Sequence, residues 1–273
     1  MRYRLLALDV DGTLIGRDLV VPPQTLAAIQ TFQERGGLVT LATGRNVRTT
    51  TVFAQQLGLT GPLICYQGAL IKDQQSGAIL FHDPVPSELA AEAVRQLRDA
   101  GVYVQAYIND ELYVPYAGEE LALYQSFSDT PHIYHVVEDL VETVRQHPPT
   151  KLLFIEHENQ VGPRLAGLQT HFIDRLQIVR SHAQFGELNA PGCTKGRALS
   201  QLAAKLGIAQ HEVAAAGDHY NDVEMVAWAG FGMAVRSGPP ELLAVAQVLI
   251  DGPEQAGLGW AIERYLLADE AAG

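Results

Sequence analysis

The chain has 273 residues, of which 47% are hydrophobic and 18% charged, a composition that fits a soluble globular protein and argues against disorder. Its 19 Lys and Arg against 31 Asp and Glu give a net charge of −12, which argues against the basic face of a nucleic-acid or membrane-surface binder. The two cysteines, Cys65 and Cys193, form no CxxC pair, so we expect neither a disulfide framework nor a cysteine zinc site.

The N-terminal segment does not resemble a signal peptide, because its apolar stretch meets Asp9 almost at once. The longest nearly apolar run, at 225–235, is too short to span a bilayer. We therefore expect a cytoplasmic protein with no membrane or nucleic-acid partner. The sequence does not indicate an oligomeric state.

The first third of the chain alternates short apolar runs with amphipathic segments. We expect strands over 5–10, 38–42 and 63–66, and helices over 22–35 and 46–57. The strand–loop–helix order predicts a parallel, doubly wound sheet with a Rossmann-like topology.

The same alternation of expected strands and helices returns near the C-terminus, so both ends of the chain are expected to build one sheet. The expected helices cover 194–206, 221–229, 239–246 and 258–267, and the expected strands cover 213–216, 231–235 and 248–250.

The middle of the chain has strands with more alternation between apolar and polar residues. The expected strands are 102–108, 111–116, 151–156 and 177–181, with helices over 87–100, 138–146 and 162–173. We predict that residues 84–188 form an inserted α+β domain, which interrupts a core made of 1–83 and 189–273.

Ligands of a doubly wound sheet bind beyond the carboxyl ends of its strands, and four polar segments are expected there. They are residues 9–13 (DVDGT), 43–45 (TGR), 195–196 (KG) and 217–222 (GDHYND).

These segments carry four carboxylates, whose mutual repulsion calls for a cation. Asp9, Asp11, Asp218 and Asp222 are hard oxygen ligands of the kind that Mg²⁺ prefers beside phosphate oxygens. The sequence therefore predicts a magnesium site at this edge.

The same segments also carry groups that suit a phosphoryl group. Thr43 offers a hydroxyl, Gly12 and Gly44 offer unobstructed backbone N–H groups, and Lys195 offers a positive charge. A carboxylate can attack phosphorus to form an acyl phosphate, and a second carboxylate two residues on can protonate the leaving oxygen and then activate water.

Each segment alone has a plainer explanation. Residues 9–13 fit a turn, 217–222 fit a helix cap, and Lys195 fits an ordinary surface charge. Their occurrence together, each at a predicted strand end or helix start, favours a common active site.

The four segments resemble the signature motifs of the haloacid dehalogenase (HAD) superfamily of phosphohydrolases. DVDGTL at 9–14, ATGR at 42–45, CTKG at 193–196 and GDHYND at 217–222 match the first to fourth motifs in order. The place and size of the insertion resemble the Cof-like subgroup with a type IIB α/β cap. The resemblance covers essentially the whole chain.

The resemblance implies a role for each matching residue. Asp9 would be the nucleophile and a metal ligand, and Asp11 the general acid and base, lending its backbone carbonyl to the metal. Thr43, with Gly44 beside it, would bind the phosphoryl group. The remaining roles are charge neutralisation by Lys195, metal ligation by Asp218, and support of the metal or its waters by Asn221 and Asp222.

Two segments near the site depart from the family pattern. Gln67-Gly68-Ala69 stands where Asn-Gly-Ala is frequent, and Val235-Arg236-Ser237-Gly238 stands where Met-x-Asn-Ala is frequent. Neither change removes a catalytic group, although substrate contacts are expected to differ.

Some polar residues near the motifs are open to two interpretations. Arg45 is either a substrate or inter-domain contact or a surface charge at a helix start. Arg180, His182 and Glu187 either line the cleft or belong to a solvated polar face.

We therefore expect a Mg²⁺-dependent phosphatase that hydrolyses a small phosphorylated metabolite, such as a sugar phosphate, through an aspartyl-phosphate, with a cap that closes over the cleft. Two alternatives stay open: a sugar phosphomutase, which returns the phosphoryl group to its substrate, and a non-catalytic sensor of a phosphorylated ligand. Retention of Asp9, Asp11, Lys195 and Asp218 speaks against the sensor.

Overall fold

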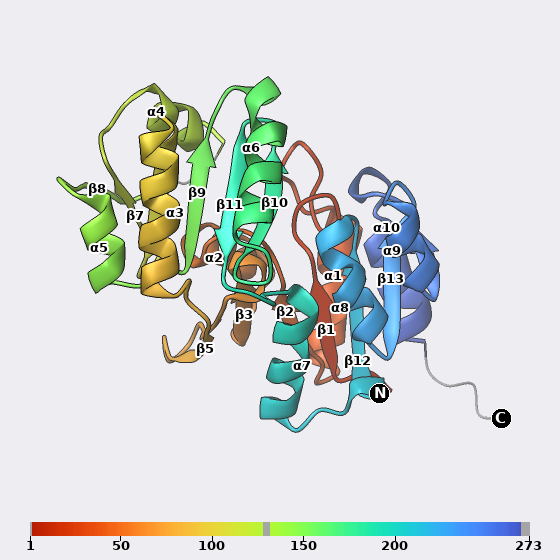
Figure 1. Ribbon diagram of the computed structural model, residues 1–273. Coiled ribbons are helices and arrows are strands. Elements are labelled where there is room, and N and C mark those ends of the chain that lie inside the picture. The colour runs from red at the N-terminus through yellow and green to blue at the C-terminus, as the bar shows by residue number, and fades with distance from the viewer. Residues whose placement is uncertain (1, 128–131, 269–273) are drawn as a thin grey trace. The chain divides into compact units, whose positions relative to one another are not determined.

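The computed structural model describes residues 2–127 and 132–268 (Figure 1). The chain divides into two compact units, one made of residues 1–81 and 194–273 and the other of residues 82–193. The catalytic and cap roles that the sequence predicts for 1–83 with 189–273 and for 84–188 remain predictions. We call the two units the core unit and the cap unit.

The core unit contains a five-stranded sheet in the order β14-β13-β12-β1-β2, in which each pair of neighbouring strands is parallel. Its strands are β1 (Leu5–Leu8), β2 (Leu38–Leu41), β12 (Val213–Gly217), β13 (Phe231–Val235) and β14 (Val248–Ile250). Leu5 of β1 pairs with Leu38 on one side and with Val213 on the other, so both ends of the chain share one sheet. The predicted parallel α/β fold is confirmed.

The helices of the core unit begin close to the predicted positions. They are α1 (Pro23–Glu34), α2 (Val47–Gln56), α7 (Lys195–Leu206), α8 (Val223–Trp228), α9 (Pro240–Val245) and α10 (Gly257–Ala261). Asn46 accepts a hydrogen bond from the backbone N–H of Thr49 and caps α2, and Thr194 accepts one from Arg197 and caps α7. The second cap makes Lys195 the first residue of α7.

The segment after β2 differs from the prediction. Strand β3 (Pro62–Cys65) meets the parallel sheet through the single bridge of Ala42 with Ile64, and pairs antiparallel with β4 (Leu70–Asp73), which lies beside β5 (Ile79–His82). The sequence instead predicts this segment as a third full strand of the main sheet. The chain turns back because Tyr66 and Gln67 both have positive φ, at 54° and 59°, a conformation that neither residue type signals.

The cap unit is built on a six-stranded sheet in the order β10-β11-β9-β6-β7-β8. Its strands are β6 (Tyr103–Ile108), β7 (Glu111–Val114), β8 (Tyr134–Val136), β9 (Lys151–Ile155), β10 (Gln177–His182) and β11 (Phe185–Asn189). Its helices are α3 (Ser87–Asp99), α4 (Glu119–Gln125), α5 (Leu140–Gln146) and α6 (Glu158–His171). Strand β8 and helix α4 are not predicted, because each is too short to show a clear period, and β11 is not predicted because it contains a glycine and two polar residues.

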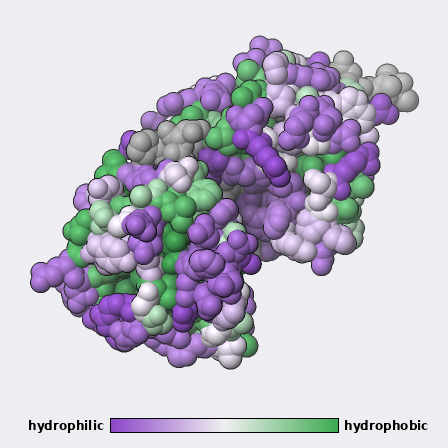
Figure 2. Space-filling model, turned by 90° about the horizontal axis from the view of Figure 1, so that it is seen from above, coloured by the Kyte–Doolittle hydropathy of each residue, from purple (hydrophilic) through white to green (hydrophobic). Residues whose placement is uncertain are grey.

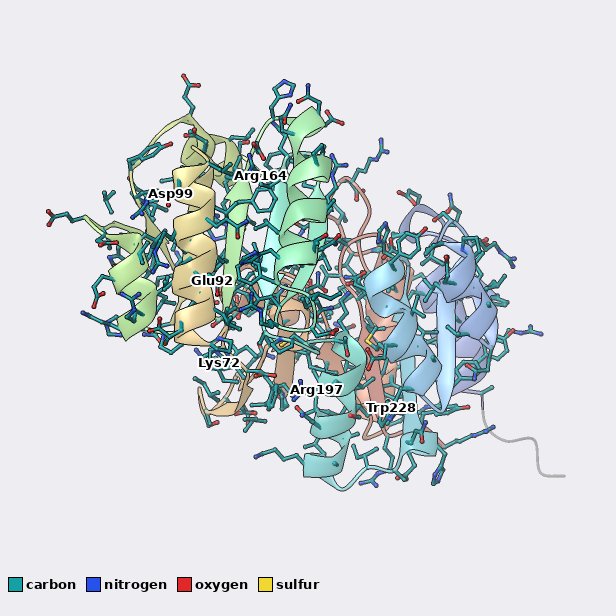
Figure 3. The ribbon with its side chains drawn as sticks, viewed as in Figure 1. Lys72, Glu92, Asp99, Arg164, Arg197 and Trp228 are labelled. Atoms are coloured by element: carbon teal, nitrogen blue, oxygen red, sulfur yellow. The ribbon has the colours of Figure 1, made fainter. Side chains whose placement is uncertain are left out.

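Helices α3, α5 and α6 pack on one face of the cap sheet. Val104, Phe154 and Leu188 of the sheet share a buried apolar cluster with residues of all three helices. At the surface, Glu92 of α3, labelled in Figure 3, lies 2.6 Å from the imidazole of His171, the last residue of α6. One face of the cap sheet is thus covered by helices.

The surface is largely hydrophilic on the face seen in Figure 2, in keeping with the charged residues of the chain. Among the residues that the structure describes, no helix combines the length and apolar character needed to cross a membrane.

Candidate active site

Asp9 follows β1 directly and is held at the carboxyl end of the parallel sheet. Its backbone N–H donates to the carbonyl of Ala216 on β12, at 3.0 Å. The residue is 5% exposed, because strands lie on both sides of β1. Burial, together with the pairing of β1 with a strand on each side, therefore fixes the direction of this carboxylate.

Lys195 joins two carboxylates in the interior. Its ammonium donates to Oδ1 of Asp9 at 2.5 Å and to Oδ1 of Asp222 at 2.7 Å, and its side chain is fully buried. Burial favours the neutral amine, but Asp222 and Asp9 outweigh it and hold the pKa of Lys195 above its ordinary value. The plainer interpretation of Lys195 as a surface charge is excluded.

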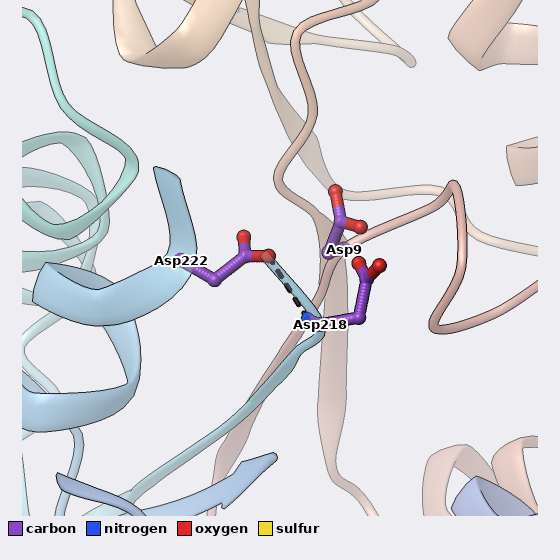
Figure 4. Close-up of side chains that lie close together, drawn as sticks. All are labelled: Asp9, Asp218 and Asp222. Carbon is purple, nitrogen blue, oxygen red and sulfur yellow. Dashed lines mark hydrogen bonds between the residues drawn. The ribbon is translucent and has the colours of Figure 1, made fainter. Parts of the chain in front are cut away.

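Asp222 holds the turn after β12. Its Oδ2 accepts a hydrogen bond from the backbone N–H of Asp218 at 3.0 Å (Figure 4) and another from the backbone N–H of His219 at 3.0 Å. Its Oδ1 is engaged by Lys195. Both oxygens are therefore occupied by protein donors, and Asp222 acts on the geometry of its neighbours.

Asp9, Asp218 and Asp222 each place one carboxylate oxygen within 4.8 Å of the others. Burial raises the pKa of Asp9, against the opposing effect of Lys195, and burial likewise raises the pKa of Asp218. Concentrated buried carboxylates of this kind fit a divalent cation with a preference for oxygen. Since Asp222 has both oxygens engaged, Asp9 and Asp218 are the side chains best placed to hold it.

Asp11 points to a different partner. The guanidinium of Arg45 binds its carboxylate with two hydrogen bonds, of 2.7 and 2.6 Å. The Asp11 side chain is 54% exposed, so it remains open to solvent. The structure thus gives Arg45 a contact that the sequence alternatives did not include, an ion pair with Asp11.

Thr43 and Gly44 lie after β2, where a backbone turn holds them. Thr43 is buried, and its hydroxyl accepts from the backbone N–H of Arg45 at 3.2 Å. A Cβ atom at Gly44 would lie 2.5 Å from Nε2 of Gln67, so glycine lets these two segments approach.

Gln67 is a residue whose role the motifs do not reveal. Its Oε1 accepts a hydrogen bond from the side chain of Asn221 at 2.9 Å, and its backbone N–H donates to the carbonyl of Thr43 at 3.0 Å. Gln67 therefore links the second and fourth motif segments. The only sequence signal for this role is that Gln67 stands where Asn is frequent in the family.

Gly12 is required by the close approach of the first and fourth motif segments. Its φ is +87°, and a Cβ atom there would overlap the carboxylate of Asp218. Gly36 has almost the same φ, +88°, but nothing lies within 4 Å of its Cβ position.

Gly12→Ala is expected to lower kcat/KM for phosphate release at least about 10²-fold, because it displaces the Asp218 carboxylate. Gly36→Ala is the matched control, in which the left-handed backbone alone costs about 1–2 kcal/mol of stability and activity is kept. Thermal melts and steady-state kinetics of both variants would test this. Equal activity in the two variants would contradict the packing argument.

The family model of the haloacid dehalogenase-like hydrolases matches residues 6–262. The chain belongs to this family. HMP-PP phosphatase of Serratia proteamaculans is 31% identical to it over 271 residues, covering 97% of this chain and 96% of that protein. The pyridoxal phosphate phosphatase YbhA of Escherichia coli is 25% identical, covering 92% of this chain and 94% of that protein. Together with the family match, these relatives support a phosphoric monoester hydrolase, and the predicted enzyme class is confirmed.

Solved structures have the same fold. TM0651 from Thermotoga maritima superimposes with a TM-score of 0.87 at 27% identity, covering 96% of this chain and 97% of that chain. The HAD subclass IIB sugar phosphatase BT4131 has a TM-score of 0.79 at 18% identity, covering 97% of this chain and 99% of that chain, which is a likeness of fold. The predicted resemblance to HAD phosphohydrolases is confirmed by the family match, and the fold agrees with that of a subclass IIB structure.

Proposed function

We propose that this member of the haloacid dehalogenase-like hydrolases is a Mg²⁺-dependent phosphomonoesterase that works through an aspartyl-phosphate on Asp9. The observation that carries the proposal is the buried contact of Asp9 with Lys195 beside Asp218, at the carboxyl end of β1. Lys195 occupies Oδ1 of Asp9, which leaves Oδ2 as the attacking oxygen. A carboxylate with one oxygen held by Lys195 and the other left to attack suits the role of a nucleophile.

In the first step, Oδ2 of Asp9 forms a bond to phosphorus while the bond from phosphorus to the ester oxygen breaks. Asp11, in its protonated form, gives its proton to the departing alcohol. In the second step, Asp11 takes a proton from water, whose oxygen attacks phosphorus and releases phosphate and the free Asp9 carboxylate. Arg45 would orient Asp11 through their paired hydrogen bonds.

The remaining side chains would bind and orient the phosphoryl group. The Thr43 hydroxyl and the backbone N–H of Gly44 would donate to its oxygens, and Lys195 would offset the negative charge that Asp9 and the phosphoryl group bring together. Asn221, held by Gln67, would contribute a further donor.

A bound Mg²⁺ would neutralise charge on the phosphoryl oxygens and on the attacking carboxylate. Asp9 and Asp218 would hold it through their side chains, and Asp11 through its backbone carbonyl. Asp222 would keep Asp218 in place through the hydrogen bond to its backbone N–H. The sequence predicts four aspartates as metal ligands. We propose instead that Asp222 positions Asp218 and that Asp11 contributes only its backbone carbonyl.

The substrate that we propose is a small phosphorylated metabolite. The named relatives include phosphatases of HMP-PP, of pyridoxal phosphate and of 5-amino-6-(5-phospho-D-ribitylamino)uracil, the last from Bacillus subtilis at 26% identity. These compounds share a compact organic group joined to phosphate, and a sugar phosphate fits the same description. We propose that the cap unit selects this organic group.

Removal of the metal is expected to abolish phosphate release from a panel of such esters. Added chelator should reduce kcat to background, and Mg²⁺ in excess of the chelator should restore it, because the buried carboxylates need a counter-charge to receive an anionic substrate. The measurement is phosphate release with and without chelator. Unchanged release in chelator would contradict the metal requirement, and an isomerised sugar phosphate without free phosphate would indicate a mutase.

A further inference from the structure

The turn that follows β3, Tyr66–Gly68, is fastened to the second and third motif segments of the core unit. The backbone N–H of Gln67 donates to the carbonyl of Thr43 at 3.0 Å. At Gly68, a Cβ atom would overlap the carbonyl oxygen of Thr194, the residue that caps α7. The turn therefore lies beside the residues that we assign to phosphoryl binding, although it belongs to none of the four motif segments.

Gln67 has a backbone conformation that its residue type rarely adopts. Its φ of 59° and ψ of 20° lie in the left-handed region, which costs about 1–2 kcal/mol for a residue that carries a Cβ atom. Asn tolerates this region better than Gln does, and Asn is frequent at this position in the family. The chain thus keeps a strained residue where a less strained one is available, and strain of this kind persists mainly at functional sites.

The side chain of Gln67 lies against the second motif segment. Gln67 is the one residue of 62–71 that is not buried, so solvent reaches it. A Cβ atom at Gly44 would lie 2.5 Å from Nε2 of Gln67 and 3.0 Å from its Cδ. Because we assign the backbone N–H of Gly44 to the phosphoryl group, the amide of Gln67 lies next to the position proposed for that anion.

Asn221 of the fourth motif segment orients this amide. The side-chain nitrogen of Asn221 donates to Oε1 of Gln67 at 2.9 Å. Within the described part of the chain, no acceptor bonds Nε2 of Gln67, so both of its N–H groups are available. Exchanging oxygen and nitrogen in both amides would keep the bond between them, but an anion beside Gly44 favours the arrangement that leaves Nε2 free.

A neutral donor is useful here because the cations of the motif segments already have carboxylate partners. Lys195 is bonded to Asp9 and Asp222, and Arg45 is paired with Asp11. An amide N–H can donate to an anion without giving up a charged partner, and a hydrogen bond to a charged group is stronger than one between neutral groups.

We propose that Nε2 of Gln67 donates a hydrogen bond to a non-bridging oxygen of the phosphoryl group, while Asn221 and the left-handed backbone hold the amide in place. The inference rests on the proposed function, since the phosphoryl group is that of the substrate. It adds a phosphate-binding residue from outside the four motif segments. Because every phosphoric ester carries the same phosphoryl group, Gln67 sets the affinity for phosphate and leaves the choice of leaving group unaffected.

The test measures competitive inhibition by inorganic phosphate with Mg²⁺ present. Gln67→Met keeps the length of the side chain but has no donor, and Gln75→Met is the control, because Gln75 is an exposed residue of the turn between β4 and β5. We expect the inhibition constant of phosphate to rise about tenfold or more in Gln67→Met, the effect of one hydrogen bond to a charged group, and to stay the same in Gln75→Met.

Two esters with different leaving groups show which part of the substrate Gln67 contacts. The values of kcat/KM for p-nitrophenyl phosphate and for the metabolite with the highest kcat/KM in the panel should fall by one common factor in Gln67→Met. An unchanged inhibition constant of phosphate would overturn the proposal. A fall confined to one of the two esters would also overturn it, because the donor would then act on a leaving group.

Gln67→Glu separates donation to the anion from support of Asn221. The carboxylate keeps an oxygen that accepts from Asn221, but it has no N–H to donate and it repels an anion. Phosphate should therefore bind at least as weakly as in Gln67→Met. If Gln67 served only to hold Asn221, this variant would keep the parent inhibition constant, and that result would overturn the donor role.

Gln67→Asn separates binding from stability. Asn suits the left-handed backbone, so the variant should melt at or above the parent temperature, whereas its shorter side chain should raise the inhibition constant of phosphate. A lower melting temperature with an unchanged inhibition constant would overturn the proposal. Failure of the parent protein to hydrolyse any ester would instead overturn the proposed function. Calorimetric titration of inorganic phosphate into the parent and Gln67→Met would then decide the role of Gln67 separately.

Discussion

Asp9→Asn is expected to lower kcat for phosphate release at least about 10⁴-fold, the scale of losing a catalytic nucleophile. The amide keeps the shape of the side chain but cannot form the acyl phosphate. It also removes one of the buried carboxylates around Lys195, whose ammonium keeps its hydrogen bond to Asp222. The fold should therefore persist while activity is lost.

The measurement is phosphate release with saturating Mg²⁺, together with a thermal melt. Asp99→Asn is the control, because Asp99 is an exposed carboxylate that pairs with its neighbour Arg98 at 2.9 Å. Incubation with substrate followed by mass spectrometry should detect a phosphorylated chain in the parent and none in Asp9→Asn. Retained turnover in a folded Asp9→Asn variant would remove Asp9 from the mechanism.

Lys195→Met is expected to damage both stability and activity. Removing the ammonium leaves Asp9 and Asp222 facing each other in the interior, and breaking a buried pair from one side costs about 3–5 kcal/mol. For a chain of this size that corresponds to a fall in melting temperature of about 10 °C. Lys205→Met, at an exposed position near the end of the same helix, should change the melt little.

The stability deficit of Lys195→Met should grow with pH. Burial already raises the pKa of Asp9, and Lys195 opposes that rise, so the variant raises it further. A carboxyl with a raised pKa in the folded state binds more protons there than in the unfolded state, and stability falls as pH rises through that window. Metal-free melts at pH 5 and pH 7.5 would measure this. A deficit that is larger at pH 5 would contradict the pairing of Lys195 with these carboxylates.

Local sequence signals were sufficient for the parallel sheet of the core unit. Short apolar runs followed by polar loops predicted the strands that precede Asp9 and Asp218, because a strand buried on both faces has to be apolar throughout. The caps at Asn46 and Thr194 likewise follow from residue type and position. The enzyme class and the family also followed from the four motif segments, and the comparisons confirm both.

Local sequence patterns do not predict the hairpin after β3 or the strand β11. Positive φ at Tyr66 and Gln67 is imposed by the surroundings, because neither residue type prefers it. Strand β11, with the sequence FGELN, includes a glycine and two polar residues that are buried. A glycine and buried polar residues depart from the apolar pattern that is typical of a buried strand.

The sequence by itself indicated which residues we propose to carry the chemistry, because motif spacing and strand ends are local properties of the chain. Only the tertiary structure decided how those residues are paired: Lys195 with Asp9 and Asp222, Arg45 with Asp11, and Gln67 with Asn221. It also decided that the amide of Gln67 lies against Gly44. Pairing and burial depend on contacts between segments far apart in the chain, and no local pattern encodes the distance between two side chains.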